Sequence, residues 1–372
     1  LALDLDAGGI WDPTEQAGVS RLAAEALLLQ LHPRLAALGA SARLQCEESG
    51  LRFTMLAPPA TWRPAAELLL EGVFHPSLAQ VFVDTARARL LRSLRFQQGD
   101  PAAEIRVAAR ESLFGVGHRW ATGACGRPET IEPLTRADAE GAASQRFAPS
   151  RAVATLAGPV TIQDGAEVLR ALGESRLPVL LPLPQPAPLP GTRDIESPTI
   201  TSWLALSFPL PPEPDDEATR FLAESLARSL RPSPLRPEVV DAAVEVERFG
   251  GGGALVVYLA VEPRNASGWI TRVRQLVEGA GAAPMDENEF TLLRRRYRGV
   301  RLLALATPEA RAADAADRLF FDHAFALPEA RIDALNIERV RAAAAALAPP
   351  AIAYLGPARA DAAPVERKMR QP

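Results

Sequence analysis

The stretch "TWRPAAELLLEGVF" (61–74) decides the fold, because a related stretch, "GWITRVRQLVEGAG", returns at 268–281. Both copies place a tryptophan near the start of a helical pattern and a Glu-Gly pair near its end, at the same offset along the chain. Self-similarity at a fixed spacing is typical of a duplicated structural unit. The sequence therefore predicts two homologous halves. The matched residues are Trp62 with Trp269, and Glu71 and Gly72 with Glu278 and Gly279.

The order of predicted elements is the same in both halves. An amphipathic helix comes first, a hairpin of alternating or apolar strands follows, then two or three helices and a short closing strand. Strands grouped with helices, without β-α-β alternation, predict an α+β fold. We expect two mixed halves, each an antiparallel-rich sheet covered by helices. The predicted elements are first helices at 15–31 (Val19, Leu22, Ala26 and Leu29 on one stripe) and 215–230 (Ala218, Phe221, Leu222 and Ser225), hairpins at 42–56 and 242–261, arginine-rich helices at 84–96 and 289–303, and closing strands at 152–159 and 351–357.

The stretch "RLPVLLPLPQPAPLPGTRDIESP" (176–198) separates the halves and holds six prolines between 177 and 190. Proline fixes φ and lacks an amide hydrogen, so this density excludes a helix or a central strand and favours an extended tether. A proline-rich recognition ligand is the other interpretation, and the position midway along the chain favours a linker. We predict an N-terminal half at 1–175, a linker at 176–198 and a C-terminal half at 199–372.

The bulk composition is that of an ordinary globular protein, with 48% hydrophobic and 23% charged residues. The net charge is −4, from 41 basic and 45 acidic residues, which gives no reason to expect nucleic acid as a partner. No apolar run reaches the ~18 residues of a membrane-spanning helix, so no membrane is expected. Cys46 and Cys125 lie in no ligand spacing, which leaves free thiols and one disulfide both open.

Three stretches carry a resemblance to a known family. "GGIWDPTEQAGVSRLAAEALL" (8–28) looks like its first strand, turn and metal-site helix. The stretch 113–160 contains "GRPETI", which matches a Gly-x-x-Glu-x-Ile turn, then "RFAP" and a final strand, and "LNIERVRAAAAALAPPAIAYLGP" (335–357) repeats that ending. The chain resembles the pitrilysin/insulinase-type zinc peptidases in their short form, typified by mitochondrial processing peptidase subunits and bacterial processing peptidases.

The resemblance implies a zinc site in the first half that this chain has lost. The family binds zinc through a His-x-x-Glu-His motif on the first helix and a later glutamate, because two imidazoles one turn apart reach one metal and the carboxylate activates water. Here Arg21, Ala24 and Glu25 take the three motif positions. Guanidinium offers no lone pair to a metal and alanine cannot move a proton. We expect instead an i,i+4 ion pair between Arg21 and Glu25 on a solvated helix face.

A second argument is independent of the alignment. The histidines are His32, His75, His118 and His323, so no His-x-x-Glu-His or His-Glu-x-x-His can exist anywhere in the chain. No glutamate lies between Glu71 and Glu104, and the corresponding helix carries arginines instead. An active peptidase with scattered zinc ligands stays as a third possibility, and the histidine count argues strongly against it. The arginines on that helix include Arg87, Arg89 and Arg92.

Other candidate sites are weaker. The family's substrate-gripping Arg and Tyr, seven residues apart, correspond to Arg236 and Ala243, so only Arg236 remains as a substrate contact, with a surface arginine as the simpler interpretation. "FGGGGAL" (249–255) lacks the Gly-Lys-Ser/Thr of a phosphate loop and is typical of a hairpin connection. His118 has no evident partner acid and is interpreted as a satisfied loop histidine. No Gly-x-Ser-x-Gly is present, which excludes that class of serine hydrolase.

The resemblance implies a catalytically silent subunit of a two-component bacterial zinc peptidase. It would form a heterodimer with a His-x-x-Glu-His subunit and close with it around a chamber that holds an extended peptide. Zinc and general base would come from the partner, so this chain would need no cofactor and would be no enzyme alone. One substrate of such pairs is the precursor peptide of pyrroloquinoline quinone. The alternative is a non-enzymatic scaffold subunit, as in a respiratory complex. The compartment stays open between bacterial cytoplasm and periplasm, since any leader would precede Leu1.

Overall fold

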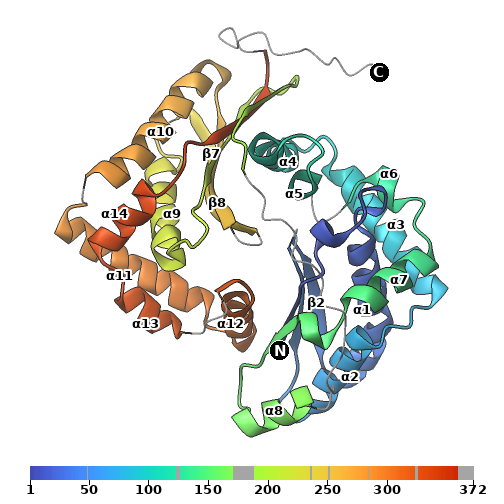
Figure 1. The fold of residues 1–372 in the computed structure, drawn as a ribbon. Coiled ribbons are helices and arrows are strands. Elements are labelled where there is room, and N and C mark those ends of the chain that lie inside the picture. Colours follow the sequence, from blue (N-terminus) through green and yellow to red (C-terminus); the bar gives the residue numbers. More distant parts are fainter. Residues whose placement is uncertain are drawn as a thin grey trace. The chain divides into compact units, whose positions relative to one another are not determined.

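The structure is a computed structural model, and it describes residues 1–47, 49–122, 126–170, 188–234, 237–249, 252–283, 285–322 and 326–358. Its helices and strands form two compact units, each assembled from three stretches of the chain (Figure 1). Unit 1 comprises residues 1–97, 122–184 and 299–330. Unit 2 comprises residues 98–121, 185–298 and 331–372.

The sheet of unit 1 has four antiparallel strands in the order β2-β3-β1-β4. The predicted hairpin at 42–56 is present as β2 (Ser41–Cys46) and β3 (Leu51–Leu56). The central strand β1 (Ala2–Leu5) is buried along its whole length between β3 and β4 (Ala152–Thr155). Because side chains alternate across a strand, complete burial of β1 requires cover on both faces of the sheet.

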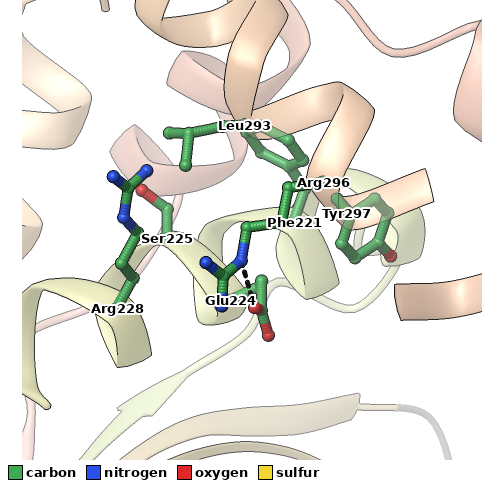
Figure 2. A pocket seen from close by; sticks show the side chains of 7 residues that line it. All are labelled: Phe221, Glu224, Ser225, Arg228, Leu293, Arg296 and Tyr297. Carbon is green, nitrogen blue, oxygen red and sulfur yellow. Dashed lines mark ion pairs between the residues drawn. The ribbon is translucent and has the colours of Figure 1, made fainter. Parts of the chain in front are cut away.

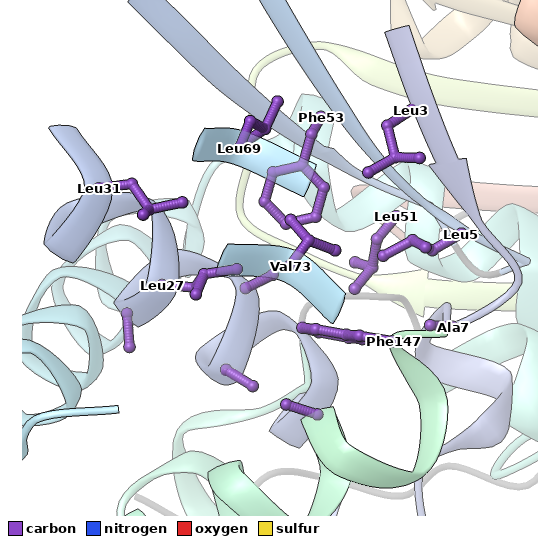
Figure 3. Close-up of a cluster of buried hydrophobic side chains, with 14 of the residues drawn as sticks. Leu3, Leu5, Ala7, Leu27, Leu31, Leu51, Phe53, Leu69, Val73 and Phe147 are labelled. Carbon is purple, nitrogen blue, oxygen red and sulfur yellow. The ribbon is translucent and has the colours of Figure 1, made fainter. Parts of the chain in front are cut away.

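One face of this sheet meets the main core of unit 1. Figure 3 shows Leu3 and Leu5 of β1 gathered with Phe53 of β3 and with leucines from two helices. The apolar stripe predicted for the first helix is buried at Val19, Leu22 and Ala26, whereas Leu29 is only partly buried. The helices of this layer are α1 (Val19–Ala37), α2 (Trp62–Phe74), α3 (Gln80–Gln97), α7 (Arg136–Arg146) and α8 (Ile162–Arg170).

The other face of the sheet is covered by α12 (Pro308–Asp322), which comes from the second half of the sequence. Ala2 packs there against alanines of α12. Arg52 of β3 donates to both carboxylate oxygens of Asp4 over 2.6 Å and to Asp317 of α12 over 2.9 Å. Burial opposes the charge on Arg52, yet the hydrogen bonds and attraction of these two carboxylates raise its pKa above the usual range.

The sheet of unit 2 has five strands in the order β5-β9-β6-β8-β7. β5 (Thr192–Glu196) runs parallel to β9 (Ala351–Gly356), and all other neighbours are antiparallel. β6 (Ser202–Pro209) is the central strand. The predicted hairpin at 242–261 is present as β7 (Val239–Phe249) and β8 (Gly252–Val261).

The helices of unit 2 include one from the first half of the sequence. α4 (Pro101–Phe114) packs against β9, β6 and β5, and its Arg106 forms a bidentate hydrogen bond to Glu245 of β7 while lying over the ring of Tyr258. A second layer of helices builds the apolar core with β6 and β8. These helices are α9 (Asp216–Leu230), α10 (Ala266–Ala282), α14 (Ile337–Ala345) and α11 (Glu287–Ala304), of which residues 287–298 belong to unit 2.

Short elements connect these layers. The described part of the chain includes short α-helices and four 3-10 turns; two of the 3-10 turns directly precede α1, and α6 packs against the second of them. The short helices are α5 (Arg119–Thr122), α6 (Pro128–Ile131) and α13 (Pro328–Asp333), and the 3-10 turns are Gly9–Trp11, Thr14–Gln16, Pro149–Arg151 and Pro263–Asn265. Among the described residues, no helix is long and apolar enough to cross a membrane.

The expected α+β fold of mixed, duplicated halves is confirmed, and several boundaries differ: for example, the closing strand predicted at 152–159 ends at Thr155, and the first helix ends at Ala37 rather than 31. The first strand lies at Ala2–Leu5, ahead of the stretch 8–28 that was expected to contain it. β5 falls inside the predicted linker 176–198, whose residues 176–187 lie outside the described residues. The first helix begins at Val19 rather than 15, because the preceding residues form a 3-10 turn. The half boundaries at 175 and 199 stay a prediction.

Candidate functional site

The predicted motif positions lie in the first two turns of α1. Arg21 and Glu25 form the expected i,i+4 ion pair, with Nε 3.8 Å from Oε1. Their side chains are only 18% and 27% exposed, so this helix face is more enclosed than the solvated face that was expected. Ala24 is completely buried and belongs to the core cluster of unit 1. A glutamate at position 24 would place a carboxylate among apolar side chains.

The residues present do not fit a zinc ion. α1 offers a single carboxylate, Glu25, which already faces the guanidinium of Arg21. A guanidinium is a permanent cation without a lone pair, so it repels a metal from the position that a ligand would need. Within the described ranges, no group of three His, Cys, Asp or Glu side chains is arranged to hold a metal. The chain therefore provides no chemistry for activating water at this position.

A buried polar cluster holds the start of α1 in place. Asp12 accepts hydrogen bonds from the N–H of Gly18 over 2.8 Å, the hydroxyl of Ser20 over 2.6 Å and Nη1 of Arg146 over 2.6 Å. Arg146, at the end of α7, also donates to the Ser20 hydroxyl over 2.6 Å. Gly18 has a φ of +93°, which lets the chain turn sharply into the helix. The cluster thus joins the loop before α1, its first turn and α7.

Burial dominates the electrostatics of this cluster. It raises the pKa of Asp12 in spite of the hydrogen bonds from Ser20, Arg146 and Gly18, and it lowers the pKa of Arg146 in spite of the attraction of Asp12. Both shifts favour the neutral forms, so desolvation exceeds the mutual attraction of the two charges. Removal of one partner alone would leave the other charge buried and unpaired. The cluster's only signal in the sequence is an aspartate shortly before a helical pattern.

The "GRPETI" stretch supports the same helix start from outside. Gly126 approaches so closely that a Cβ at this position would lie 2.2 Å from the carbonyl oxygen of Ala17, and its φ of +69° also requires glycine. The hydroxyl of Thr130 donates to the same oxygen over 2.7 Å. The two stretches that carry the family resemblance, 8–28 and 113–160, therefore meet at α1.

The helix that was expected to lack a zinc-binding glutamate is α3. Arg87 is partly buried and donates to Asp84 and to the carbonyl oxygen of Leu134. Arg89 and Arg92 are exposed on the side of α3 that faces away from α1. These arginines extend into solvent rather than forming a cluster with Arg21 or Glu25.

The structure places only some of the weaker candidate residues. Arg236 and Cys125 lie outside the described residues, as does the middle of the "FGGGGAL" hairpin at 250–251. Ala243 is in β7, and Cys46, which is partly buried at the end of β2, forms no disulfide within the described residues. His118 accepts from the N–H of Trp120 over 3.3 Å and stacks on Phe114 at 5.6 Å, in agreement with a satisfied loop histidine.

A shallow pocket lies between α9 and α11 in unit 2 (Figure 2). Phe221 and Leu293 line it together with Arg228, and the ion pair of Glu224 with Arg296, 3.8 Å long, closes one side. Its volume, including the open side, is about 210 Å³. The enclosed part is only about 10 Å³, whereas small-molecule sites usually enclose roughly 300–1,000 Å³, so this pocket does not indicate a cofactor or substrate site.

Comparison with known proteins gives matches in structure only: no protein-family model and no curated protein matches the sequence. The peptidase M16 inactive domain from Pseudomonas fluorescens is similar over 97% of this chain and 93% of that chain, with a TM-score of 0.82 and 19% identity. A protease from Helicobacter pylori is similar over 95% and 92%, with a TM-score of 0.79 and 15% identity. A chain of complex III2 from Candida albicans is similar over 95% and 90%, with a TM-score of 0.77 and 14% identity. The pitrilysin-type fold implied by the sequence is confirmed.

Proposed function

We propose that this chain is a non-catalytic member of the pitrilysin-type zinc peptidases, and that it acts as the silent subunit of a bacterial two-component peptidase. The observation that carries the proposal is the replacement of the motif on an otherwise retained helix. Arg21 and Glu25 pair with each other and Ala24 is buried, while the loop, turn and α7 residues that position α1 are all in place. A helix kept in position without its metal ligands favours a role in assembly.

The partner in this proposal is a homologous chain that carries His-x-x-Glu-His and supplies both zinc and general base. The similarity to a solved domain described as inactive supports this division of labour. The two chains would close around a chamber for a peptide. The precursor peptide of pyrroloquinoline quinone is the substrate that we propose, by resemblance to known pairs of this family.

Peptide holding would use the edges of the two sheets. β2 and β4 are the edge strands in unit 1, and β5 and β7 are the edge strands in unit 2. An extended peptide that adds to such an edge gains main-chain hydrogen bonds that depend little on its sequence, while its alternate side chains meet the protein. This mode suits a subunit that holds diverse or unfolded segments without cutting them.

The test is co-expression with a homologue encoded beside it that contains His-x-x-Glu-His. We expect a 1:1 complex on size exclusion, zinc in the partner only, and no peptide cleavage by this chain alone. The mixture should cleave far faster than the partner alone. A fully active partner that forms no complex with this chain would overturn the proposal.

The second candidate is a non-enzymatic scaffold within a larger assembly. The similarity to a chain of complex III2 favours it, because that likeness also covers nearly the whole of both chains. Loss of the metal ligands suits a scaffold equally well. Purification of the tagged chain from its native source discriminates the two: a two-chain complex with peptidase activity supports the first candidate, and a multi-subunit assembly without it supports the second.

A further inference from the structure

The outer face of α3 carries three arginines that no acidic side chain pairs with in the described part of the chain. Arg89, Arg92 and Arg95 are exposed and recur every three residues, so they lie along one side of the helix. No ion pair or hydrogen bond joins any of the three to the part of the chain that the structure describes. The sequence from 85 to 99 contains no acidic residue at all.

This arrangement differs from the other side of the same helix. Arg87 there is bound by Asp84 and by a backbone carbonyl of the α6–α7 segment. Like charges one turn apart disfavour a helix, by a few tenths of a kcal/mol per pair. The negative end of the helix dipole offsets part of this repulsion for the last turn, where Arg95 lies, but not for Arg89 in the middle. A bound anion would remove the remaining repulsion.

Exposed apolar side chains flank the arginines at both ends. Phe96 is 87% exposed and lies two turns after Arg89, and Val81 is 62% exposed near the start of α3. Val81 and Phe96 are about 22 Å apart along the axis at ~1.5 Å per residue. A cationic strip with an apolar group at each end matches an amphipathic acidic segment better than a diffuse polyanion.

We propose that this arginine face (Val81, Arg89, Arg92, Arg95 and Phe96) docks an acidic segment of a partner protein. The segment would present carboxylates about one helical turn apart, each within reach of a guanidinium, and an apolar residue against Phe96. Arginine binds carboxylates in a bidentate manner, which gives such contacts a defined geometry. The protein's net charge of −4 disfavours a nucleic acid, which needs a broad basic surface.

The arginine face is distinct from the sheet edges that would hold a peptide. α3 packs against α1, α6 and α7, and its outward residues lie on the far side from these contacts. The inference therefore goes beyond the proposed function, and it requires neither zinc nor cleavage.

The test measures binding of a synthetic helix-forming peptide with glutamates one turn apart and a terminal phenylalanine. The full-length protein is compared with the variant Arg89→Glu/Arg92→Glu/Arg95→Glu. The control variant Arg228→Glu/Arg274→Glu/Arg295→Glu changes the charge equally but removes exposed arginines from three different helices of unit 2. A peptide with glutamine in place of glutamate and a thymidine oligonucleotide are the control ligands. Thermal unfolding of all variants checks that they are folded.

We expect the acidic peptide to bind the unmodified protein and the control variant alike, and to bind the α3 variant about tenfold more weakly or worse. Affinity should fall with added salt, and the glutamine peptide should not bind. An equal loss of affinity in both variants would show that binding depends only on the net charge of the protein, and it would overturn the proposal. Tighter binding of the oligonucleotide, or no binding of the acidic peptide at physiological salt, would overturn it as well.

Discussion

Arg146 donates a hydrogen bond to Asp12 over 2.6 Å at the point where α1 begins, although the two residues lie in separate stretches of the sequence. This contact gives the second stretch a structural role that does not depend on a metal motif. Its residues position the helix on which the motif would lie, and the same helix supplies much of the core of unit 1. The fold needs α1 whether or not it binds a metal.

We predict that substitutions of Asp12 and Arg146 have strongly non-additive effects on the free energy of unfolding. Arg146→Met leaves Asp12 buried and uncompensated, which should lower the free energy of unfolding by about 3–5 kcal/mol. Asp12→Asn/Arg146→Met removes both charges and keeps an acceptor for the Gly18 N–H, so it should lose much less than the sum of the single changes. Urea unfolding of the four forms measures the coupling.

The control for this cycle is Arg136→Met on the same helix. Arg136 forms an exposed i,i+4 pair with Glu140, so its removal should change stability by no more than about 0.5 kcal/mol. Additive losses at Asp12 and Arg146 would contradict the coupling.

The turn at Gly126 should tolerate no side chain. Gly126→Ala combines a positive φ with a Cβ 2.2 Å from the Ala17 carbonyl, whereas Gly115→Ala has a positive φ but no atom within 4 Å. We expect Gly115→Ala to lose about 1–3 kcal/mol from backbone strain alone, because its φ of 93° and ψ of 150° lie in a region that essentially only glycine adopts. Gly126→Ala should lose at least ~2 kcal/mol more, because the chain must move. Similar unfolding midpoints for the two variants would show that the close approach of Gly126 to the Ala17 carbonyl does not limit stability.

The helical pattern was predictable from local periodicity, and the duplication from the return of the stretch 61–74 at 268–281. The stripe of Val19, Leu22 and Ala26 is buried as expected, since an amphipathic helix must turn that face to a core. β1 was missed although the leucines of residues 1–6 alternate with alanine and aspartate, which is a strand pattern; the family resemblance places the expected first strand within 8–28. The partner of the internal Asp4 is the distant Arg52, which no local pattern reveals. The packing of α12 and α4 could not be predicted, because an amphipathic face does not specify which sheet it covers.

The exchange of helices between the halves predicts that neither half folds alone. A chain of 1–175 lacks α12, which covers one face of the unit 1 sheet, and a chain of 199–372 lacks α4, which packs on the unit 2 sheet. We expect each half alone to aggregate or to unfold without cooperativity, and co-expressed halves to form one stable species. Circular dichroism and thermal unfolding measure this.

A chain cut at an engineered protease site within 176–187 is the control, because both pieces remain present and together retain every helix and strand that the structure describes. It should unfold like the intact chain. Cooperative unfolding of either isolated half would contradict the prediction.

The cap of α7 predicts a pH-dependent contribution to stability. The hydroxyl of Thr135 and its N–H donate to the carboxylate of Asp138 over 2.6 and 2.8 Å, which lowers the pKa of Asp138 below its usual 3.8. A lowered pKa in the folded state stabilises the protein above pH 3.8, and this contribution is lost as the pH falls through the lowered value. The stability difference between the unmodified protein and Asp138→Asn should therefore be constant near neutral pH and shrink below 3.8.

Glu132→Gln removes an exposed carboxylate nearby and controls for the loss of one charge. The free energy of unfolding of Glu132→Gln should stay close to that of the unmodified protein at all pH values where the protein is folded. A stability difference between the unmodified protein and Asp138→Asn that increases in acid would contradict the assignment of Asp138 as part of the cap.

The most direct test of the central claim is the peptide-cleavage rate of a zinc-carrying homologue, measured with and without a saturating amount of this chain. We predict no cleavage by this chain alone and at least a tenfold higher rate in the mixture, roughly 1.4 kcal/mol in the barrier, with a 1:1 complex on size exclusion. An unchanged rate with no complex would contradict the account and leave the chain as a scaffold.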